Sequence, residues 1–244
     1  MIGVIIMLYE EKISQCNTLE DLFAIWKNEK EPKGGINHRE NFFIADGIVD
    51  ENVWKSGKRK KILLVLKEAY GEDWGNNTLV TWLKNDHPQI GPWKRIAKIV
   101  YGIQNTTSNS IARYKEKLSK DEHNSSLEQI AVLNIKKSYG DSRSKNDELK
   151  MYAEYDRQEI KKEIELINPD IIVCGNTFQI LYETVYQKNP ITNASDNWYY
   201  YLNIIDGKEK RLFIDYYHPS FYLCPTLLYY YGLIGIYQQA LLDK

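Results

Sequence analysis

Short runs of consecutive apolar residues alternate along the chain with longer segments in which apolar residues recur every three or four positions. The runs are KKILLVLK at 60–67, IAVLNIK at 130–136 and DIIVCG at 170–175. Such runs, bounded by charge or glycine, predict strands that are buried on both faces. A later stretch, NWYYYLNIIDGKEKRLFIDYY, predicts two hairpin-like strands around Asp206-Gly207.

The periodic segments predict helices around these strands. Two short helices are expected within about 5–30, and Thr18 marks the start of the second. The stretch at 144–167 predicts one long amphipathic helix that ends before Asn168-Pro169. Further helices are predicted over NTLVTWLKN, WKRIAKIVYGI, the first part of IARYKEKLSKDEHNSSL, TFQILYETVYQ and PTLLYYYGLIGIYQQALL, the last with Pro225 in its first turn.

This alternation of short apolar strands and long helices indicates the α/β class. We expect a three-layer α/β/α sandwich with a central, mostly parallel four-stranded sheet. No repeat, low-complexity run or linker divides the sequence, so a single domain over 1–244 is expected. It would carry an N-terminal helical extension at about 1–35 and a helical insertion at about 82–126.

Composition adds few constraints. With 43% hydrophobic and 27% charged residues the chain is typical of a globular protein, and its formal net charge is −1. Binding to nucleic acid would therefore require a local basic cleft. The 19 tyrosines and 6 tryptophans are explained first by packing, although the same side chains stack on bases.

The cysteines and the N-terminus bear on the cellular compartment. Three scattered cysteines form no CxxC pair, so we expect neither a zinc ribbon nor a disulfide framework, and reduced thiols in a cytoplasmic protein. The apolar start MIGVIIML is too short to span a bilayer and lacks the basic beginning of a signal peptide. No association with a membrane is expected.

Polar residues follow three of the predicted strands at the same end. Glu68 follows the first strand, Asn134 interrupts the second near its end, and His218 follows the last. Each alone has an ordinary explanation, as a solvated loop acid, a turn-forming amide or a structural histidine. Ligand sites of such sheets lie beyond the carboxyl ends of the strands. We therefore expect the three side chains to converge on one cleft.

Four motifs resemble those of a known family. They are KEAYGED at 67–73, VLNIKK at 132–137, EIELINPDIIVCGN at 163–176 and HPS at 218–220. In order and spacing they resemble the motifs of the uracil-DNA glycosylase superfamily, over about residues 60–225. The resemblance implies an enzyme of DNA repair that hydrolyses the N-glycosidic bond of uracil or a related damaged base.

The resemblance also implies a role for each of the three polar residues. Glu68 would position the attacking water and stabilise positive charge on the sugar. Asn134 would bind the edge of the base, since its amide carries a donor beside an acceptor. His218, as a neutral imidazole held by Pro219, would stabilise negative charge on the departing base. The base must leave the stack to reach such a site.

Other residues of these motifs would bind the substrate. The base would be surrounded by Lys67, Ala69, Tyr70 and Trp74, and either Tyr70 or Trp74 would be the aromatic platform on which it stacks. Ser220 would contact a phosphate. The side chain inserted into the base stack would be Phe221, Tyr222 or Leu223. Two positions depart from the family pattern, because Lys67 stands where glycine is usual and Tyr70 where proline is common. Lys67 would crowd the pocket, contact phosphate or pair with Glu68.

Two further groups of cations are candidates for phosphate binding. Lys94, Arg95 and Lys98 share a predicted helix face beside Trp93, where a solvated face is the favoured interpretation over a phosphate-binding patch. Lys136 and Lys137 lie next to Asn134 and are better placed for phosphate. Some members of the superfamily hold an iron–sulfur cluster on four cysteines, which three cysteines cannot supply. No metal or cofactor is expected.

The leading hypothesis is thus a DNA base glycosylase, single- or double-stranded DNA being its partner and a monomer the favoured state. The first alternative is a catalytically silent member of the same fold that binds nucleic acid or a protein. The second is a hydrolase of small nucleosides or nucleotides. Nucleophile-elbow, Walker and dinucleotide fingerprints are absent from the sequence.

Overall fold

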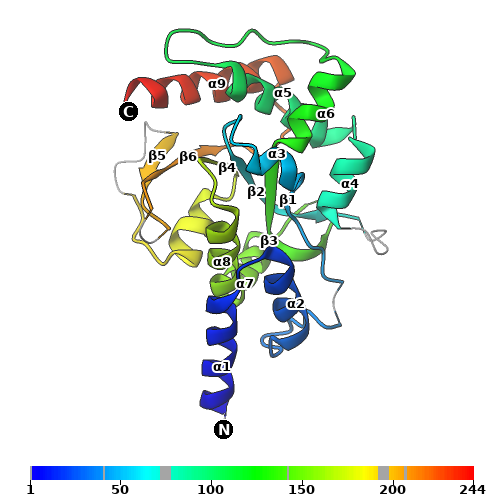
Figure 1. Cartoon of the computed structure of the whole chain (residues 1–244), viewed down its shortest axis with the longest axis vertical. Coiled ribbons are helices and arrows are strands. Elements are labelled where there is room, and N and C mark those ends of the chain that lie inside the picture. Colours follow the sequence, from blue (N-terminus) through cyan, green and yellow to red (C-terminus); the bar gives the residue numbers. More distant parts are fainter. Residues whose placement is uncertain (1, 41, 72–77, 142, 192–197, 206–207) are drawn as a thin grey trace.

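The computed structural model describes residues 2–40, 42–71, 78–141, 143–191, 198–205 and 208–244. Within these residues, six strands form one mixed sheet in the order β1-β3-β2-β4-β6-β5 (Figure 1). The strands are β1 (Gly47–Ile48), β2 (Ile62–Tyr70), β3 (Ile130–Gly140), β4 (Ile171–Gly175), β5 (Tyr199–Leu202) and β6 (Arg211–Tyr216). The protein is therefore an α/β protein, as predicted.

The prediction of a four-stranded sheet was wrong in the number of strands. The four central strands, β3, β2, β4 and β6, are parallel, and antiparallel β1 and β5 add one strand to each edge. Strand β1 has only two residues, too few for a periodic pattern. The hairpin-like pairing of β5 with β6 is confirmed, while its predicted turn at Asp206-Gly207 lies outside the described residues.

The central strands are apolar because helices cover both of their faces. Along β2, Leu64 and Leu66 pack into one core while Leu63 and Val65 pack into another on the opposite face. The first core is completed by α4 (Leu79–Asp86), α5 (Gly91–Asn105), α6 (Lys120–Glu128) and α9 (Thr226–Leu242). The segment predicted as an insertion thus contributes α5 to this core.

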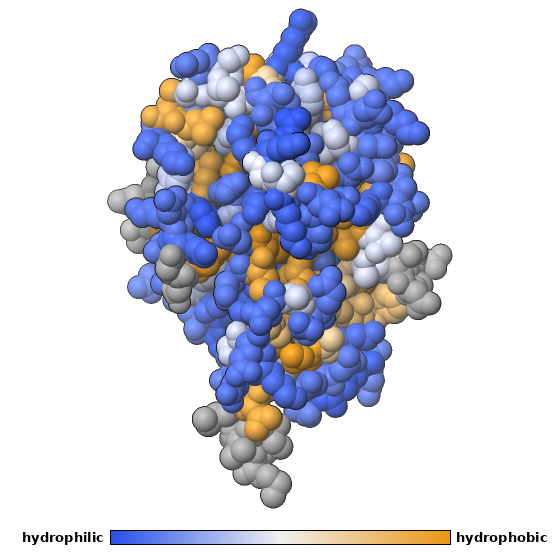
Figure 2. Space-filling model, viewed as in Figure 1, coloured by the Kyte–Doolittle hydropathy of each residue, from blue (hydrophilic) through white to orange (hydrophobic). Residues whose placement is uncertain are grey.

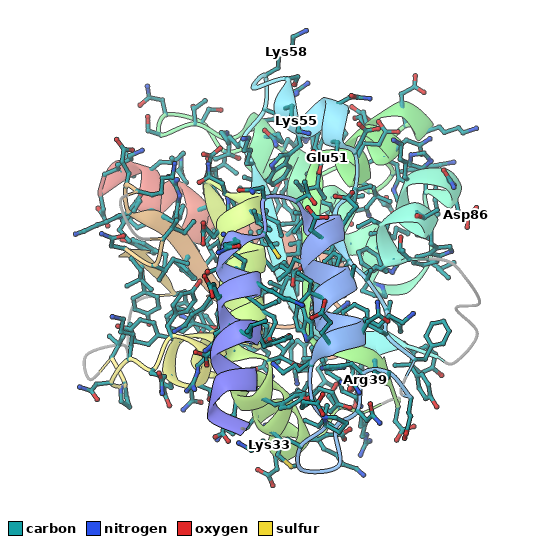
Figure 3. The ribbon with its side chains drawn as sticks, turned by 60° about the horizontal axis from the view of Figure 1, so that its bottom comes forward. Lys33, Arg39, Glu51, Lys55, Lys58 and Asp86 are labelled. Carbon is teal, nitrogen blue, oxygen red and sulfur yellow. The ribbon has the colours of Figure 1, made fainter. Side chains whose placement is uncertain are left out.

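The second core lies under the remaining helices. These are α1 (Ile2–Gln15), α2 (Leu19–Glu29), α3 (Glu51–Lys55), α7 (Asn146–Tyr155), α8 (Arg157–Ile167) and the π-helical turn η1 (Ile180–Val185). Figure 3 shows α1 and α2 side by side, with labelled charged residues such as Lys33 and Lys58 at the periphery. The predicted helix start is confirmed, since the Thr18 hydroxyl accepts a hydrogen bond from Asp21 N.

Two predicted helices had wrong limits. The first part of 111–127, which was expected to be helical, is not a helix; α6 begins only at Lys120, where Ser119 and Glu122 form a capping box that fixes the start. The long helix expected over 144–167 is broken at Asp156 into α7 and α8. At Asp156 the apolar spacing continues across the true boundary, so periodicity alone did not reveal it.

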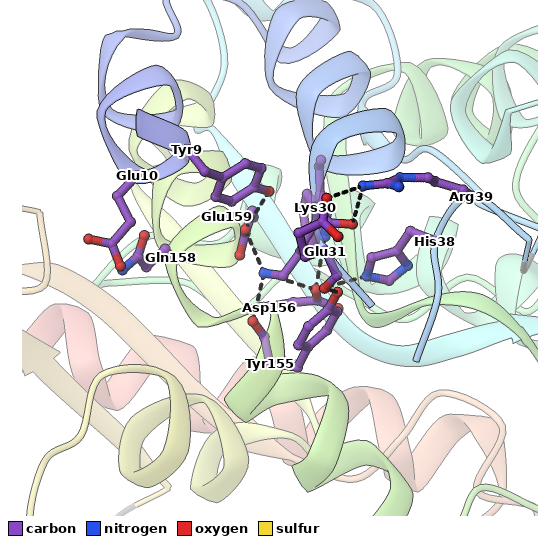
Figure 4. A network of polar contacts seen from close by, with 11 residues as sticks. Tyr9, Glu10, Lys30, Glu31, His38, Arg39, Tyr155, Asp156, Gln158 and Glu159 are labelled. Atoms are coloured by element: carbon purple, nitrogen blue, oxygen red, sulfur yellow. Dashed lines mark hydrogen bonds and ion pairs between the residues drawn. The ribbon is translucent and has the colours of Figure 1, made fainter. Parts of the chain in front are cut away.

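The break at Asp156 serves a buried polar network between α2 and the α7–α8 corner (Figure 4). One carboxylate oxygen of Asp156 accepts a hydrogen bond of 2.9 Å from the Trp26 indole and lies 2.8 Å from His38 Nε2. Lys30 Nζ lies 3.4 Å from the same oxygen and 2.5 Å from Glu159. The N-terminal helices are therefore tied to the sheet by polar contacts as well as apolar packing.

The surface in Figure 2 is mainly hydrophilic, with apolar residues visible in separate patches. None of the described helices is long and apolar enough to cross a membrane.

Candidate active site at the carboxyl ends of the strands

Strand alternation places Glu68 and Asn134 on the same face of the sheet. Leu66 packs in the core beneath α5 and α9, and Glu68 follows it by two residues along β2. On the neighbouring strand, Asn134 is the Cα partner of Leu66, and Lys136 is the partner of Glu68. Because side chains alternate along a strand, all four project from that face near its carboxyl end.

His218 reaches the same face from the loop after β6. Its Cδ2 atom lies 3.4 Å from the point where a Cβ on Gly175 would stand, and the Leu66 Cδ2 atom lies 3.0 Å from that point. The imidazole therefore sits over the end of β4 beside Leu66. The strands β4, β2 and β3 are adjacent, so His218 and Asn134 lie on either side of Leu66. The strand under His218, β4, and the strand that carries Asn134, β3, are two strand spacings apart, about 10 Å.

Contacts within its own loop orient His218, and burial keeps its imidazole neutral. The Ser220 backbone N–H donates to His218 Nδ1 at 3.2 Å, and the Ser220 hydroxyl lies 2.5 Å from the same nitrogen. Burial, followed by the positive charge of Lys67, lowers the pKa of His218 to about 4. With Nδ1 acting as acceptor, the ring proton is on Nε2, which is left as a donor. Ser220 thus orients His218, and its phosphate contact stays a prediction.

The loop of His218 is clamped by Arg95. One guanidinium nitrogen donates to the carbonyl oxygens of Pro219 at 3.0 Å and Phe221 at 2.7 Å, and the other donates to Cys224 O at 3.1 Å. The guanidinium also lies 4.6 Å from the centre of the Tyr229 ring. Arg95 is a positioning residue that the sequence analysis missed, since nothing in the spacing of cations distinguishes an inward-facing arginine from a solvated one.

The interpretation of residues 94–98 as a solvated or phosphate-binding face is corrected accordingly. Lys94 is exposed, but Arg95 faces the loop, and Lys98 is buried with its ammonium 3.0 Å from the Tyr114 hydroxyl and 2.5 Å from Glu116 O. Two of the three cations therefore bind groups of the protein itself.

Glu68 is held in a narrow space by Lys136. Its side chain is 7% exposed, and Oε2 lies 3.3 Å from Lys136 Nζ, which in turn contacts Glu148 at 2.6 Å. Burial alone would lower the pKa of Lys136, but Glu148 and Glu68 outweigh it and raise that pKa. A Cβ on Gly140 would stand only 2.0 Å from the Glu68 carboxyl carbon. Gly140 is therefore what allows the carboxylate to lie there.

Asn134 is fixed through its backbone while its amide is left available. Its N–H donates to Asp46 Oδ2 at 2.6 Å, and the residue is only 2% exposed. Within the described residues its side-chain amide makes no hydrogen bond, and it is not among the buried groups that lack a partner. The amide thus retains contact with solvent at the bottom of the site.

The two lysines beside Asn134 differ from expectation. Lys137 is fully buried, with its ammonium 2.5 Å from Asp46 and 2.7 Å from Glu163, so the prediction that it contacts phosphate was wrong. The alternating pleat of β3 points it away from Lys136 and into the second core. Lys136 lies at the site, but it is already paired with two carboxylates.

Lys67 lies on β2 next to Glu68 and therefore points to the opposite face. It is half-buried, forms no ion pair within the described residues, and acts on the site through the lowered pKa of His218. The predicted ion pair between Lys67 and Glu68 is therefore not formed. The other two predicted roles of Lys67, crowding the pocket and contacting phosphate, stay predictions. Ala69 is buried in the first core beyond a register shift at Glu68/Ala69, and Tyr70 is strongly exposed.

The wedge candidates divide into packed and exposed side chains. Phe221 stacks on Tyr217 with ring centres 4.8 Å apart, whereas Tyr222 and Leu223 are 83% and 70% exposed. Only the latter two have the freedom that insertion would require. Trp74 lies outside the described residues. Among those that are described, no group of three or more His, Cys, Asp or Glu side chains is placed to hold a metal ion.

No known protein-family model matches the sequence, and no curated protein matches it significantly.

Proposed function

We propose that the protein is a base N-glycosylase of the uracil-DNA glycosylase type, acting on a base that has left its stack. The observation that carries the proposal is that an unpaired amide, a neutral imidazole and a carboxylate share one face at one end of the sheet. Asn134 and His218 flank Leu66, and Glu68 follows Leu66 by two residues. An apolar floor between two hydrogen-bonding groups suits a planar base.

Each group has the chemistry that breaking an N-glycosidic bond requires. The Asn134 amide offers both a donor and an acceptor, which complements the edge of uracil and opposes cytosine. The Nε2–H of neutral His218 donates to an oxygen of the base as negative charge develops there. Glu68 accepts a proton from water and stabilises the cationic sugar. Carboxylate, amide and imidazole act together, and no step needs a metal-bound nucleophile.

The test is release of base from oligonucleotides that contain uracil, hypoxanthine or mismatched thymine, with alkali to reveal abasic sites. Glu68→Gln should lower the rate by about 100-fold or more, the usual size of a general-base contribution. Glu148→Gln is the matched control, because Glu148 contacts the same Lys136 from outside. Its rate should stay within about threefold of the wild type. Equal rates in the wild type and Glu68→Gln would contradict the proposal.

The pH profile gives a second test of the assignment to His218. Because burial and Lys67 lower the pKa of His218 to about 4, its imidazole stays neutral from about pH 8 to about pH 5. Base release should therefore not fall over that range through protonation of His218. A loss of activity with a midpoint near pH 6.5 that disappears in His218→Gln would contradict the role of a neutral imidazole.

One observation favours a second candidate, a catalytically silent protein that binds nucleic acid. The carboxylate that must activate water is only 7% exposed and is held by Lys136. A folded wild-type protein that binds DNA, releases no base from any of these oligonucleotides and binds equally well as Glu68→Gln would establish this candidate instead.

A further inference from the structure

Exposed aromatic side chains gather along the carboxyl edge of the sheet. Tyr70 and Tyr139 end β2 and β3, Trp198 precedes β5, Tyr217 follows β6, and Tyr222 lies in the loop after His218. Their exposed fractions are 74% for Tyr70, 37% for Tyr139, 41% for Trp198, 42% for Tyr217 and 83% for Tyr222. Burial therefore does not account for these rings.

These rings lie on both sides of the proposed pocket. The strand order places β3 and β2 on one side of β4, and β6 and β5 on the other. From β3 to β5 there are four strand spacings, about 19 Å, which is long enough for several nucleotides of an extended strand. On the β6 side the rings form a row, in which Trp198 lies 5.5 Å from Tyr217 and Tyr217 stacks on Phe221.

The cations of the same edge are mostly engaged within the protein. Arg95 binds three carbonyl groups of the His218 loop, and Lys136 is paired with Glu68 and Glu148. Lys137 is buried. Within the described residues Lys67 forms no ion pair, and neither do the exposed Arg143 and Lys145 that follow β3, so these three cations can supply phosphate contacts. Affinity for duplex DNA comes mainly from cations at the phosphates, and this edge offers few of them.

We propose that the site binds single-stranded nucleic acid by stacking bases on this aromatic edge, with little contribution from phosphate contacts. Every base has a face that stacks on tyrosine or tryptophan, whereas in a duplex those faces are occupied by neighbouring bases. A single strand also presents its base to Asn134 and His218 without disruption of pairing. The role of the flanking bases is new, and only the identity of the central pocket rests on the proposed glycosylase function.

The test measures binding of a short, undamaged, labelled single strand by fluorescence anisotropy, beside the matching duplex, at two salt concentrations. The single strand should bind more tightly. Its affinity should fall with a slope no steeper than about −2 in log–log form, the value for three phosphate contacts. Tyr70→Ala and Tyr222→Ala should each weaken binding by about 5- to 150-fold. Tyr70→Phe and Tyr222→Phe should bind as the wild type does.

Tyr231→Ala is the control for general loss of an exposed ring, because Tyr231 is 40% exposed on α9. It should leave binding unchanged. Circular dichroism spectra would verify that all variants fold. Tighter binding of the duplex, a steep salt dependence, or equal affinities of the wild type and both alanine variants would overturn the proposal. Absence of any binding would also overturn it and would leave a protein partner as the occupant of the aromatic edge.

The binding experiment tests this inference independently of the proposed glycosylase activity, because its probe contains no base to be removed. Single-strand binding with the expected variants but no release of any base would support this inference and reject the enzymatic function. Release of uracil from duplexes without affinity for single strands would do the reverse.

Discussion

Lys136 and Lys137 are neighbours in the chain and have opposite structural roles. Lys136 lies at the edge of the sheet between Glu68, which is nearly buried, and Glu148, whose side chain is 40% exposed. Lys137 lies in a closed cluster with Asp46 and Glu163, and none of the three side chains is exposed. The same pairing of a lysine with two carboxylates therefore serves a candidate site in one case and the architecture in the other.

The difference follows from the pleat of β3 and from what covers each face. The Lys137 ammonium lies over the rings of Phe23 and Trp26 on α2, and helix α8 supplies Glu163 from the other side. Asp46 belongs to both regions, because it pairs with Lys137 and also accepts the backbone N–H of Asn134. The buried cluster thus provides the fixed point from which Asn134 is held.

The largest effect that would sharpen this comparison is expected from Lys137→Met. It leaves Asp46 and Glu163 buried without the cation that binds them, and the free energy of unfolding should fall by about 3–5 kcal/mol. Lys136→Met is the matched change at the site. It leaves one nearly buried carboxylate, Glu68, without its cation, whereas Glu148 stays solvated, so it should cost less, about 1–3 kcal/mol. Urea denaturation of the two variants gives both values. Similar losses in the two would mean that the clusters do not differ as the burial indicates.

An intermediate effect is expected from Gly140→Ala, which acts on the open pair alone. The added methyl would overlap the Glu68 carboxyl carbon, so the side chain must move away from Lys136. Stability should fall by about 1–3 kcal/mol, as for other overpacked sites. Base release should fall toward the level of Glu68→Gln.

Gly235→Ala provides the control for Gly140→Ala. A Cβ on Gly235 would meet no atom within 4 Å, and this helical position should gain up to about 1 kcal/mol with activity unchanged. Full base release by a folded Gly140→Ala protein would show that the position of the Glu68 carboxylate does not matter.

The smallest effect, taken per unit of pH, is expected in the pH dependence of the closed cluster. Burial, followed by the charge of Asp46, raises the pKa of Glu163 well above its ordinary value of 4.5. Above about pH 4.5, the Glu163 side chain of the unfolded protein loses its proton, whereas the same side chain in the folded protein keeps it. Stability should then decrease as pH rises, until the raised pKa is passed, with a slope of up to about 1.4 kcal/mol per pH unit.

Glu163→Gln should remove this part of the pH dependence, because a glutamine cannot ionise. Unfolding curves from about pH 5 to about pH 8 would measure it. The Glu148 side chain is 40% exposed, so Glu148→Gln should keep the wild-type dependence of stability on pH. Parallel stability profiles of the wild type and Glu163→Gln would indicate that Glu163 is ionised in the folded protein.

The sequence by itself determined the four central strands, because a run of apolar residues buried on both faces is a local property. It also placed Glu68, Asn134 and His218 at one end of the sheet, since parallel strands bring their carboxyl ends together. The strand period of two already separates Lys136 from Lys137, since neighbouring residues of a strand point to opposite faces. The pattern of apolar and polar residues did not indicate the two-residue strand β1 or the break between α7 and α8 at Asp156.

Only the tertiary structure decided which polar groups remain free. Arg95, Lys98 and Lys137 carry the same charge in the sequence as solvated cations do, and their engagement depends on segments more than fifteen residues away. The cost of burying an unpaired charge requires such partners, and packing of remote helices supplies them. The aromatic edge likewise emerged because Tyr70 and Tyr222 are left uncovered, which no local pattern specifies.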